Sequence, residues 1–406
     1  MKRLIAHKIR LYPSKEQSIL INKGIGCNRL MYNLMLSERK QVWEENKENK
    51  KVVYNWKYRT IKEIKSEYEF MNEVDSQLFN WTNINLKNAY SNFFKSLSGK
   101  RQGGLVGFPE FKKKKEYGSY TTSNVNNTIR YIDDTHIKLP KLGSVKFKNK
   151  RNIEGIIKQV TISKSPAGKY FCSVSIEQKI EEAEKVELTD KSKIIGLDMC
   201  LSNFFVDSDG NSPYFTKRYR KAEKKLKRLQ HIESRKKKSS NRKKKLRKSI
   251  NLLNEKITNQ RTDFIHKLSK QLIDNYDVIV VEALNLKAMS QALKLGKSVM
   301  DLGYSQFINQ LQYKCDWYGK HLVQADKWFA SSKICHNCGF KYKDLTLSER
   351  KWVCPNCGAS IDRDENAAIN LKQLGMGYAR KCTQSQRNSA AMKCINYDDV
   401  SYTNHS

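Results

Sequence analysis

Two pairs of cysteines place the strongest constraint on how part of this chain folds. Cys335 and Cys338 form one CxxC pair, Cys354 and Cys357 form another, and fifteen residues separate the pairs. Each pair bends into a knuckle that presents two thiolates, and two knuckles complete the tetrahedron of ligands that Zn²⁺ prefers. Four thiolates leave no open coordination position, so the sequence predicts one structural zinc ion rather than a catalytic one.

Neighbouring residues support this interpretation. Gly339 and Gly358 follow the two pairs and permit the turn that closes each knuckle. His336 could bind metal, but its place inside a CxxC pair favours a side chain that faces solvent. The other six of the ten cysteines are scattered. Because the N-terminus has no apolar run that could act as a secretion signal, we expect free thiols in a reducing cytosol rather than disulfides.

The charge balance predicts a polyanionic partner. The 406 residues include 77 lysines and arginines against 41 acidic residues, a formal net charge of +36. Such a chain repels itself, and a partner that neutralises many charges at once explains it best. A membrane surface is the alternative, but it is usually bound through an amphipathic basic helix or a lipid anchor, and no stretch approaches the ~20 apolar residues of a membrane span. We therefore expect nucleic acid as the partner and a cytoplasmic, nucleoid-associated protein.

The positive charge is densest between Lys217 and Lys248, where 18 of 32 residues are Lys or Arg and two are acidic. Apolar residues keep helical spacing before and after Ser239, which predicts a helical hairpin. The segment could be a solvated basic face. At this charge density, without compensating acids, we favour a surface that faces phosphates.

Alternating and helical patterns divide the first part of the chain. Residues 6–12 alternate like a half-buried strand that Pro13 ends, and short alternating stretches between 119 and 178 predict a small antiparallel β unit. Residues 14–98 between them have helical spacing and open on a capping box at Ser14. We expect the first strand to pair with the later β unit, which makes the helical residues an insertion in a β-barrel.

Three acidic residues adjoin apolar segments of the second half. Asp198 lies near the end of an apolar strand, and Glu282 directly follows residues 278–281, a β-branched run typical of a strand buried on both faces. Asp364, with Asp362 before it, lies where an Ala-rich helix begins. Carboxylates at strand ends and helix starts can converge at the carboxyl edge of a sheet. Three of them could hold two Mg²⁺ ions about 3.5–4 Å apart, as in phosphodiester hydrolysis.

Each acid also has a purely structural interpretation. Asp198 could cap a turn, Glu282 could be a solvated strand end, and Asp364 could be a helix N-cap. Their joint position beside buried strands favours a shared chemical role. The residues alone leave open whether that role is a nuclease or a Mg²⁺-dependent transferase.

Several further motifs follow one another in a fixed order. They are His7–Pro13, Gly26–Asn33, Gly107–Lys112, Ile195–Asp198, Val280–Asn285, Ser331–Cys335 and Asp362–Ala368. In this order they resemble the TnpB family, the RNA-guided nucleases that insertion sequences encode and relatives of the type V CRISPR effectors. The resemblance extends from near the N-terminus to about Leu374.

The resemblance implies a multidomain α+β fold in several parts. These are a wedge β-barrel (residues 1–13 and 119–185), a helical recognition lobe inserted in it (14–118), an RNase H-like (RuvC) α/β nuclease domain (190–332 and 360–376), and an inserted zinc ribbon that binds target nucleic acid (333–359). Residues 377–406 are polar, and we expect them to form a disordered tail.

The resemblance also implies an activity. A guide RNA from the transposon end pairs with target double-stranded DNA beside a short motif that the protein reads, and the DNA is cleaved with Mg²⁺. Catalysis and Mg²⁺ binding fall on Asp198, Glu282 and Asp364. Asp364 is preferred to Asp362 because the third acid opens an Asp-x-Asn-Ala pattern. Motif recognition falls on five polar residues between lobe and barrel: Gln77, Asn80, Thr122, Ser123 and Asn124.

One position departs from the family pattern. Cys200 stands two residues after the first acid, where the family commonly has Gly, and its side chain could crowd the metal site or be accommodated by a small shift. All three acids are present, so we expect cleavage by a monomer on one guide RNA. The alternatives are a non-cleaving RNA-guided repressor, a miniature type V CRISPR effector and, less expected, a DNA-joining transposase.

Overall fold

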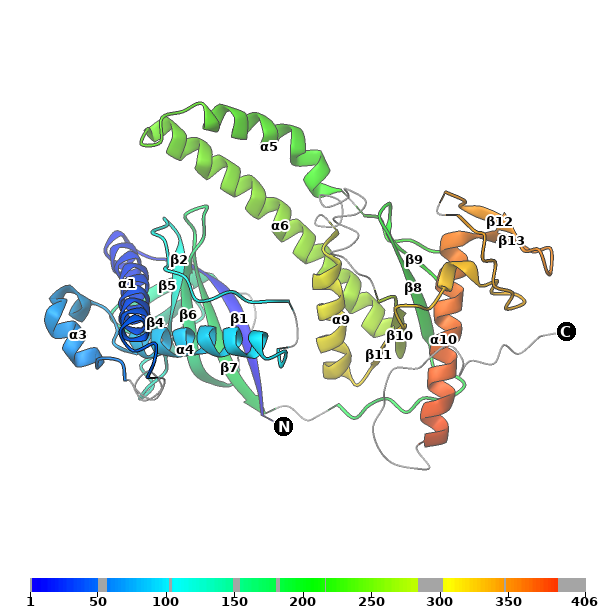
Figure 1. Cartoon of the computed structure of the whole chain (residues 1–406), viewed down its shortest axis with the longest axis horizontal. Coiled ribbons are helices and arrows are strands. Elements are labelled where there is room, and N and C mark those ends of the chain that lie inside the picture. The colour runs from blue at the N-terminus through cyan, green and yellow to red at the C-terminus, as the bar shows by residue number, and fades with distance from the viewer. Residues whose placement is uncertain are drawn as a thin grey trace. The chain divides into compact units, whose positions relative to one another are not determined.

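A computed structural model of the chain describes two compact units, Met1–Glu181 and Glu182–Ser406 (Figure 1). The described residues are 2–49, 57–101, 104–148, 154–179, 183–215, 217–283, 302–346 and 348–385. None of the helices in these ranges is both long enough and apolar enough to cross a membrane.

The first unit is built on a seven-stranded antiparallel sheet with the order β2-β6-β7-β1-β5-β4-β3. Its strands are β1 (Lys2–Tyr12), β2 (Gly118–Ser123), β3 (Arg130–Tyr131), β4 (His136–Leu139), β5 (Gly143–Lys148), β6 (Ile156–Lys164) and β7 (Tyr170–Lys179). β1 pairs with β7 along ten residues and with β5 at its end. The predicted pairing of the first strand with the later β unit is confirmed, and a closed barrel remains a prediction.

The helices of this unit lie in the sequence between β1 and β2. They are α1 (Lys15–Glu45), α3 (Ile61–Glu67), the 3₁₀ turn η1 (Glu69–Glu73) and α4 (Gln77–Leu97). The capping box is confirmed, since the Gln17 amide donates to Ser14 Oγ and the Ser14 amide donates to Gln17 Oε1. Buried residues of α1, α4 and the sheet form one apolar core.

The second unit contains a four-stranded mixed sheet with the order β11-β10-β8-β9. Its strands are β8 (Ile194–Cys200), β9 (Phe204–Asp207), β10 (Val278–Val281) and β11 (His321–Gln324). β10 is parallel to both neighbours, and β9 is antiparallel to β8. All four residues of β10 are buried, as the β-branched run predicts. β11 was not predicted, because four residues with polar ends carry no strand pattern.

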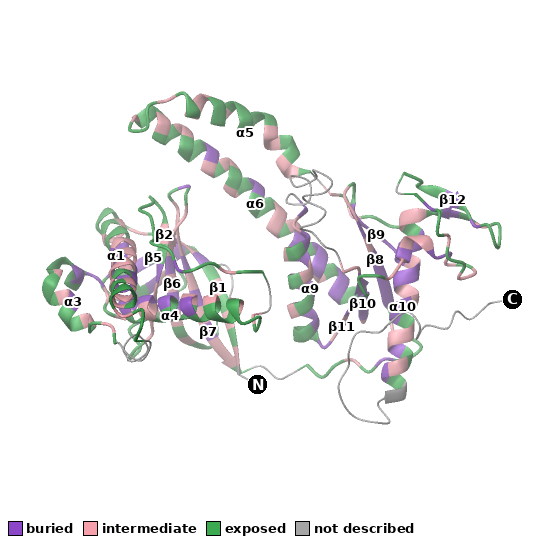
Figure 2. Ribbon diagram, viewed as in Figure 1, coloured by how far each residue is buried: buried purple, intermediate pink, exposed green. Residues whose placement is uncertain are grey.

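The basic segment forms the predicted hairpin of α5 (Arg218–Ser234) and α6 (Asn241–Asn275). Leu226 of α5 and Ile250 and Ile257 of α6 form a narrow buried seam between the helices. Most other positions of the hairpin are exposed or half-buried, as Figure 2 shows in green and pink. A single apolar seam leaves the lysines and arginines accessible to a partner.

Two more helices complete this unit, α9 (Tyr304–Tyr318) and α10 (Arg363–Ser385). The prediction of a disordered tail from residue 377 is wrong for residues 377–385, because α10 continues to Ser385 and buries Ala379 and Cys382. Leu371, Leu374 and these two residues keep helical spacing, which extends the apolar face of the helix. Residues 386–406 lie outside the described residues.

The cysteine segment lies between η2 (Ser331–Lys333) and α10. It contains a two-stranded hairpin of β12 (Lys351–Val353) and β13 (Ser360–Asp362). Leu345, Trp352 and Ile361 pack with the cysteines as a small core of their own. Too few apolar residues are present for such a core to hold a fold without further crosslinks.

Candidate active site and metal centre

The parallel pairing of β8 and β10 brings two of the three predicted acids together. Val281 stands opposite Leu197, so Glu282 leaves β10 beside Asp198 of β8. Each of the two side chains shifts the pKa of the other, and the negative charge of Asp364 acts on both. The site forms at the carboxyl ends of the parallel strands, where open α/β sheets place their ligands.

Burial gives this pair unusual proton affinities. It raises the pKa of Asp198 well above its usual range, and the negative charges of Glu282 and Asp364 raise it further. Burial also raises the pKa of Glu282, against a hydrogen bond that Ser331 Oγ donates to Glu282 Oε1 at 2.6 Å. Two half-buried carboxylates that repel each other's charge favour a proton or a cation between them. This donor set therefore fits a hard divalent cation such as Mg²⁺, which takes carboxylate oxygens.

The start of α10 distinguishes Asp362 from Asp364. Asp362 Oδ1 accepts hydrogen bonds from the backbone amides of Asp364 (3.1 Å) and Glu365 (3.3 Å), so Asp362 acts as the N-cap of the helix. Asp364 is the second residue of α10, and in these hydrogen bonds its side chain does not cap the helix. The N-cap role that the sequence allowed for Asp364 is therefore filled by Asp362.

The carboxylate of Asp364 is engaged by Arg350 of the cysteine segment. Arg350 Nη1 lies 3.0 Å from Oδ1 and 3.3 Å from Oδ2. Among the described residues, the four cysteines are the only group of three or more potential ligands whose atoms all lie within 4.8 Å of one another. Asp364 is near enough to Asp198 and Glu282 to influence their charge, but the three acids are not drawn together as the four sulfurs are.

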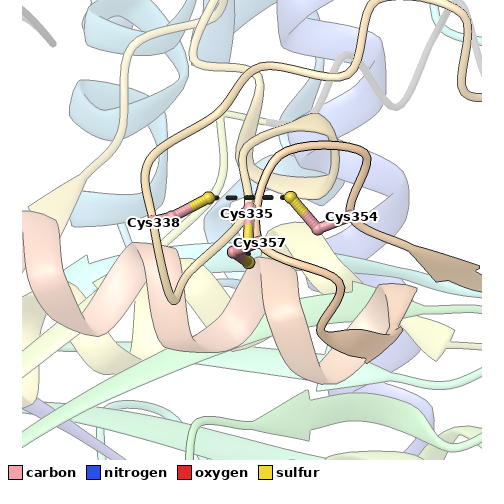
Figure 3. Close-up of side chains that lie close together, drawn as sticks. All are labelled: Cys335, Cys338, Cys354 and Cys357. Atoms are coloured by element: carbon pink, nitrogen blue, oxygen red, sulfur yellow. Dashed lines mark hydrogen bonds between the residues drawn. The ribbon is translucent and has the colours of Figure 1, made fainter.

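The four cysteine sulfurs lie together as the sequence predicts (Figure 3). Cys335 Sγ is 3.7 Å from Cys357 Sγ, and Cys338 Sγ is 3.6 Å from Cys354 Sγ. A tetrahedral zinc ion with Zn–S bonds of 2.3 Å requires sulfurs about 3.8 Å apart. The distances therefore fit one zinc ion bound by all four cysteines.

The backbone explains why the sulfurs converge. The amide of Gly339 donates to the Cys335 carbonyl (2.8 Å), and that of Gly358 donates to the Cys354 carbonyl (2.9 Å). Both glycines have positive φ, 75° and 72°, which closes each turn. The two knuckles therefore share one backbone geometry.

The prediction that His336 faces solvent is wrong. Its side chain is half-buried, and both its backbone amide and its Nδ1 lie 2.9 Å from Asn366 Oδ1 of α10. A partner 30 positions away leaves no trace in the local sequence. Sequence analysis also passed over Ser331 and Arg350, although the Ser331–Cys335 motif contained the first of them.

Cys200, the departure from the family pattern, ends β8 and is half-buried. Its sulfur accepts a hydrogen bond from Ser202 Oγ (3.6 Å), and its backbone carbonyl accepts one from the Tyr304 hydroxyl (2.5 Å). The same hydroxyl donates to the Phe204 carbonyl (3.0 Å), so it fixes the turn between β8 and β9.

The five polar residues expected to read a DNA motif lie on adjoining elements of the first unit, the start of α4 and the end of β2. Thr122 is buried and donates to Asp75, and Ser123 accepts from Trp81 Nε1 (2.8 Å). Asn124 Nδ2 donates to the Ile157 carbonyl of β6 (2.9 Å), and Asn124 Oδ1 accepts from the Ile129 amide (2.8 Å). Asn80 is the exposed member, and its Nδ2 donates to Oε1 of the half-buried Gln77 at 3.1 Å.

A basic cavity of about 970 Å³ opens elsewhere on the first unit. Its walls are residues 22–29 of α1 and the segment 110–119, with Lys164 from β6. Asn33 fixes the segment to α1 through reciprocal hydrogen bonds with the backbone of Lys112 (2.8 and 3.0 Å). Exposed lysines beside the exposed rings of Phe111 and Tyr117 suit the phosphates and bases of a nucleic acid.

The chain matches three family models. They are described as "Helix-turn-helix domain" (residues 1–48), "Probable transposase" (173–293) and "Cas12f1-like, TNB domain" (304–371). In this structure the described residues of the first range form β1, the single long helix α1 and the residues that follow it.

Similar proteins span most of the chain. A protein of Streptomyces pristinaespiralis named "Putative RNA-guided DNA endonuclease" is 31% identical, over 91% of this chain and 89% of its own. "Putative RNA-guided DNA endonuclease InsQ" of Escherichia coli (strain K12) is 29% identical, over 92% and 93%. "TnpB-like protein L79" of Acanthamoeba polyphaga mimivirus is 34% identical, over 34% and 27%.

A solved structure shares the fold. It is the cryo-EM structure of a Cas12f1-sgRNA-target DNA complex, with a TM-score of 0.54 and 13% identity, over 92% of this chain and 98% of that one. At this identity the match supports a common mixed α/β architecture.

Proposed function

The chain belongs to the TnpB family, and on that basis we propose that it is an RNA-guided DNA endonuclease of an insertion sequence. Its guide RNA comes from the transposon end, and its target is double-stranded DNA beside a short motif. The observation that carries the proposal is the meeting of Asp198 and Glu282 on parallel strands, with Asp364 at the start of the adjoining helix.

The second unit would be the nuclease. A mixed sheet with one antiparallel edge strand, crossed by a helix that supplies the last acid, supports an RNase H-like domain of the RuvC type. The cysteine segment would be its inserted zinc ribbon. In the first unit, the sheet would be the wedge and the helices between β1 and β2 the recognition lobe.

Asp198, Glu282 and Asp364 would hold two Mg²⁺ ions. When bound, the ions supply charge stabilisation for the attacking and leaving oxygens of the phosphodiester. A cation held between Asp198 and Glu282 would offset their mutual repulsion and so favour the charged form of both carboxylates. Arg350, 68% exposed, leaves Asp364 easily, because a solvent-exposed ion pair contributes little.

Zinc would have a structural role. Cys335, Cys338, Cys354 and Cys357 would fill its coordination sphere and so exclude a bound water or substrate. The small core of the cysteine segment depends on this crosslink.

The basic surfaces would hold the nucleic acids. The α5–α6 hairpin and the cavity beside α1 would bind phosphates of guide RNA or target DNA, without reading sequence. Sequence would be read by base pairing with the guide and, at the adjacent motif, by amide side chains that can contact base edges. Asn80, which is exposed, and Gln77, which it contacts, are the first candidates, and Thr122, Ser123 and Asn124 would support them.

The test is co-expression of the chain with its flanking non-coding DNA, followed by sequencing of the RNA that copurifies. The particle is then given a plasmid library with randomised sequence beside the guide match, with Mg²⁺ or with EDTA. Asp198→Ala is the inactive variant. Asp263→Ala, which removes an exposed carboxylate of α6, is the matched control.

We expect a bound RNA and Mg²⁺-dependent cleavage that Asp198→Ala abolishes and Asp263→Ala retains. Tight target binding without cleavage by the wild type would instead indicate an RNA-guided repressor. Absence of bound RNA would overturn the guided mechanism. An array-derived guide would indicate a miniature type V CRISPR effector.

A further inference from the structure

Ser331 is a buried serine, 4% exposed, that directly contacts one of the proposed catalytic acids. Its Oγ lies 2.6 Å from Glu282 Oε1 and donates to it. A hydroxyl is a neutral donor, so it fixes the orientation of a carboxylate and leaves the carboxylate's negative charge available to a cation. A lysine or arginine in its place would compete with that cation.

The backbone of Ser331 is held from the other side by two asparagines of α10. Asn370 Nδ2 donates to the carbonyl oxygens of Ser331 and Ile334, both at 2.7 Å. Asn366 Nδ2 donates to the Ile334 carbonyl at 2.7 Å and lies 3.4 Å from the carbonyls of Ser331 and Ser332.

These asparagines are buried and four residues apart, so they lie on one face of the helix. Buried amides that donate to the backbone of a distant segment fix its position more rigidly than surface contacts do. These hydrogen bonds fix the position of residues 331–334 relative to α10. Asp364 is the second residue of that helix.

Asn366 also reaches the cysteine site. Its Oδ1 lies 2.9 Å from the amide and from Nδ1 of His336, inside the first CxxC pair. One buried side chain thus joins the helix that carries Asp364, the segment that carries Ser331, and the first zinc knuckle. The segment Asp364–Ala368 therefore contains a proposed catalytic acid, Asp364, and the residue Asn366 that holds the neighbouring segments in place.

We propose that Ser331 is a positioning residue of the acid site: its hydroxyl orients the Glu282 carboxylate for the metal, and Asn366 and Asn370 hold Ser331 in place. The inference rests on the proposed metal-dependent function. The hydroxyl acts through Glu282, in the way that outer-shell hydrogen bonds orient metal ligands elsewhere.

The experiment uses the full chain with its bound guide RNA and Mn²⁺ as a spectroscopic substitute for Mg²⁺. Binding of Mn²⁺ is measured by electron paramagnetic resonance, independently of cleavage. The Mg²⁺ concentration for half-maximal single-turnover cleavage, zinc content and melting temperature are measured on the same preparations.

The variants isolate the hydroxyl. Ser331→Ala removes the hydroxyl. Ser331→Thr and Ser331→Val introduce side chains of nearly equal size, but Thr keeps the hydroxyl and Val has a methyl group in its place. Ser332→Ala is the matched control, because Ser332 meets Asn366 through its backbone carbonyl. If Ser331→Ala does not fold, the comparison of Thr with Val decides the question.

We expect Ser331→Ala and Ser331→Val to weaken Mn²⁺ binding and raise the Mg²⁺ midpoint by about 10–100-fold, with zinc content unchanged. Ser331→Thr and Ser332→Ala should behave as the wild type. Equal Mn²⁺ affinity in the Thr and Val variants would overturn the positioning role while leaving the nuclease intact. A wild type that neither binds Mn²⁺ nor cleaves would overturn the proposed function, and the positioning role with it.

Discussion

Gly196 of β8 lies directly against the backbone of α10 at Ala368. A Cβ added at Gly196 would stand 2.1 Å from the Ala368 carbonyl oxygen and 2.5 Å from the Lys372 amide nitrogen. Asp198 follows on the same face of β8, and Asp364 lies one helical turn before Ala368. Close contact of strand and helix at Gly196 therefore sets the separation between these two acids.

We predict that Gly196→Ala displaces α10 from the sheet. Because the obstructing atoms are backbone, the change should cost about 3 kcal/mol of stability or more and abolish cleavage. Thermal unfolding and the plasmid assay measure the two effects. Gly104→Ala, in the loop after α4, is the control, since a Cβ there meets nothing within 4 Å and the substitution should be neutral or slightly stabilising. Equal melting temperatures for both variants would contradict the close packing.

A second prediction follows from the raised pKa of Asp198. A carboxyl whose pKa is higher in the folded than in the unfolded chain binds its proton more tightly when folded. The resulting stabilisation is present at low pH and is lost as the pH rises from the unfolded to the folded pKa. Without divalent metal, a neutral side chain at position 198 therefore favours the folded state increasingly as the pH rises above the unfolded pKa.

Asp198→Asn should accordingly raise the melting temperature in Mg²⁺-free buffer near pH 8, by roughly 2–5 °C. The difference should shrink towards pH 4, where the unfolded carboxyl also binds its proton. Added Mg²⁺ should stabilise the wild type and not the variant. A wild type more stable than Asp198→Asn at pH 8 without metal would show that the acid is not electrostatically strained.

Local patterns predicted the elements that local chemistry determines. The β-branched run before Glu282, the spacing of the four cysteines and the capping box at Ser14 each depend on neighbours in sequence, and the structure has all three. The hairpin was predictable too, because its apolar seam recurs at helical spacing.

Features that depend on distant partners could not be predicted. His321–Gln324 becomes a strand because β10 offers it a parallel edge, and its own residues carry no alternation. The contact of Ser331 with Glu282 joins positions 49 apart, and that of His336 with Asn366 joins positions 30 apart. The assignment of catalytic and DNA-reading roles rests on family resemblance and remains a proposal.

Zinc content provides a third prediction. Purified protein should contain one zinc ion per chain by elemental analysis. Cys354→Ala should lose most of this zinc, because a site with three thiolate ligands binds zinc far less tightly than a site with four. Cys172→Ala removes an equally buried sulfur from the β sheet of the first unit and should retain the ion. Full zinc occupancy in Cys354→Ala would contradict the four-cysteine site.

The last prediction concerns the basic cavity of the first unit. Lys113 and Lys114 line it and are exposed, whereas Lys112 is held over the Tyr32 ring at 3.8 Å. If the two exposed lysines contact phosphates, replacing both with alanine should weaken nucleic-acid binding and flatten the dependence of log K on log salt concentration by about 1 for each lysine.

Filter binding of the guide RNA and of the target duplex, over a series of salt concentrations, measures these slopes. The matched control replaces Lys138 of β4 and Lys146 of β5, two exposed lysines towards the opposite edge of the sheet from β2 and β6. This control removes the same charge. A long-range effect of net charge would change both pairs alike, because it does not depend on where a lysine lies. A slope that changes only for Lys113 and Lys114 would locate phosphate contacts in the cavity, and the nucleic acid whose slope responds would be the one that occupies it.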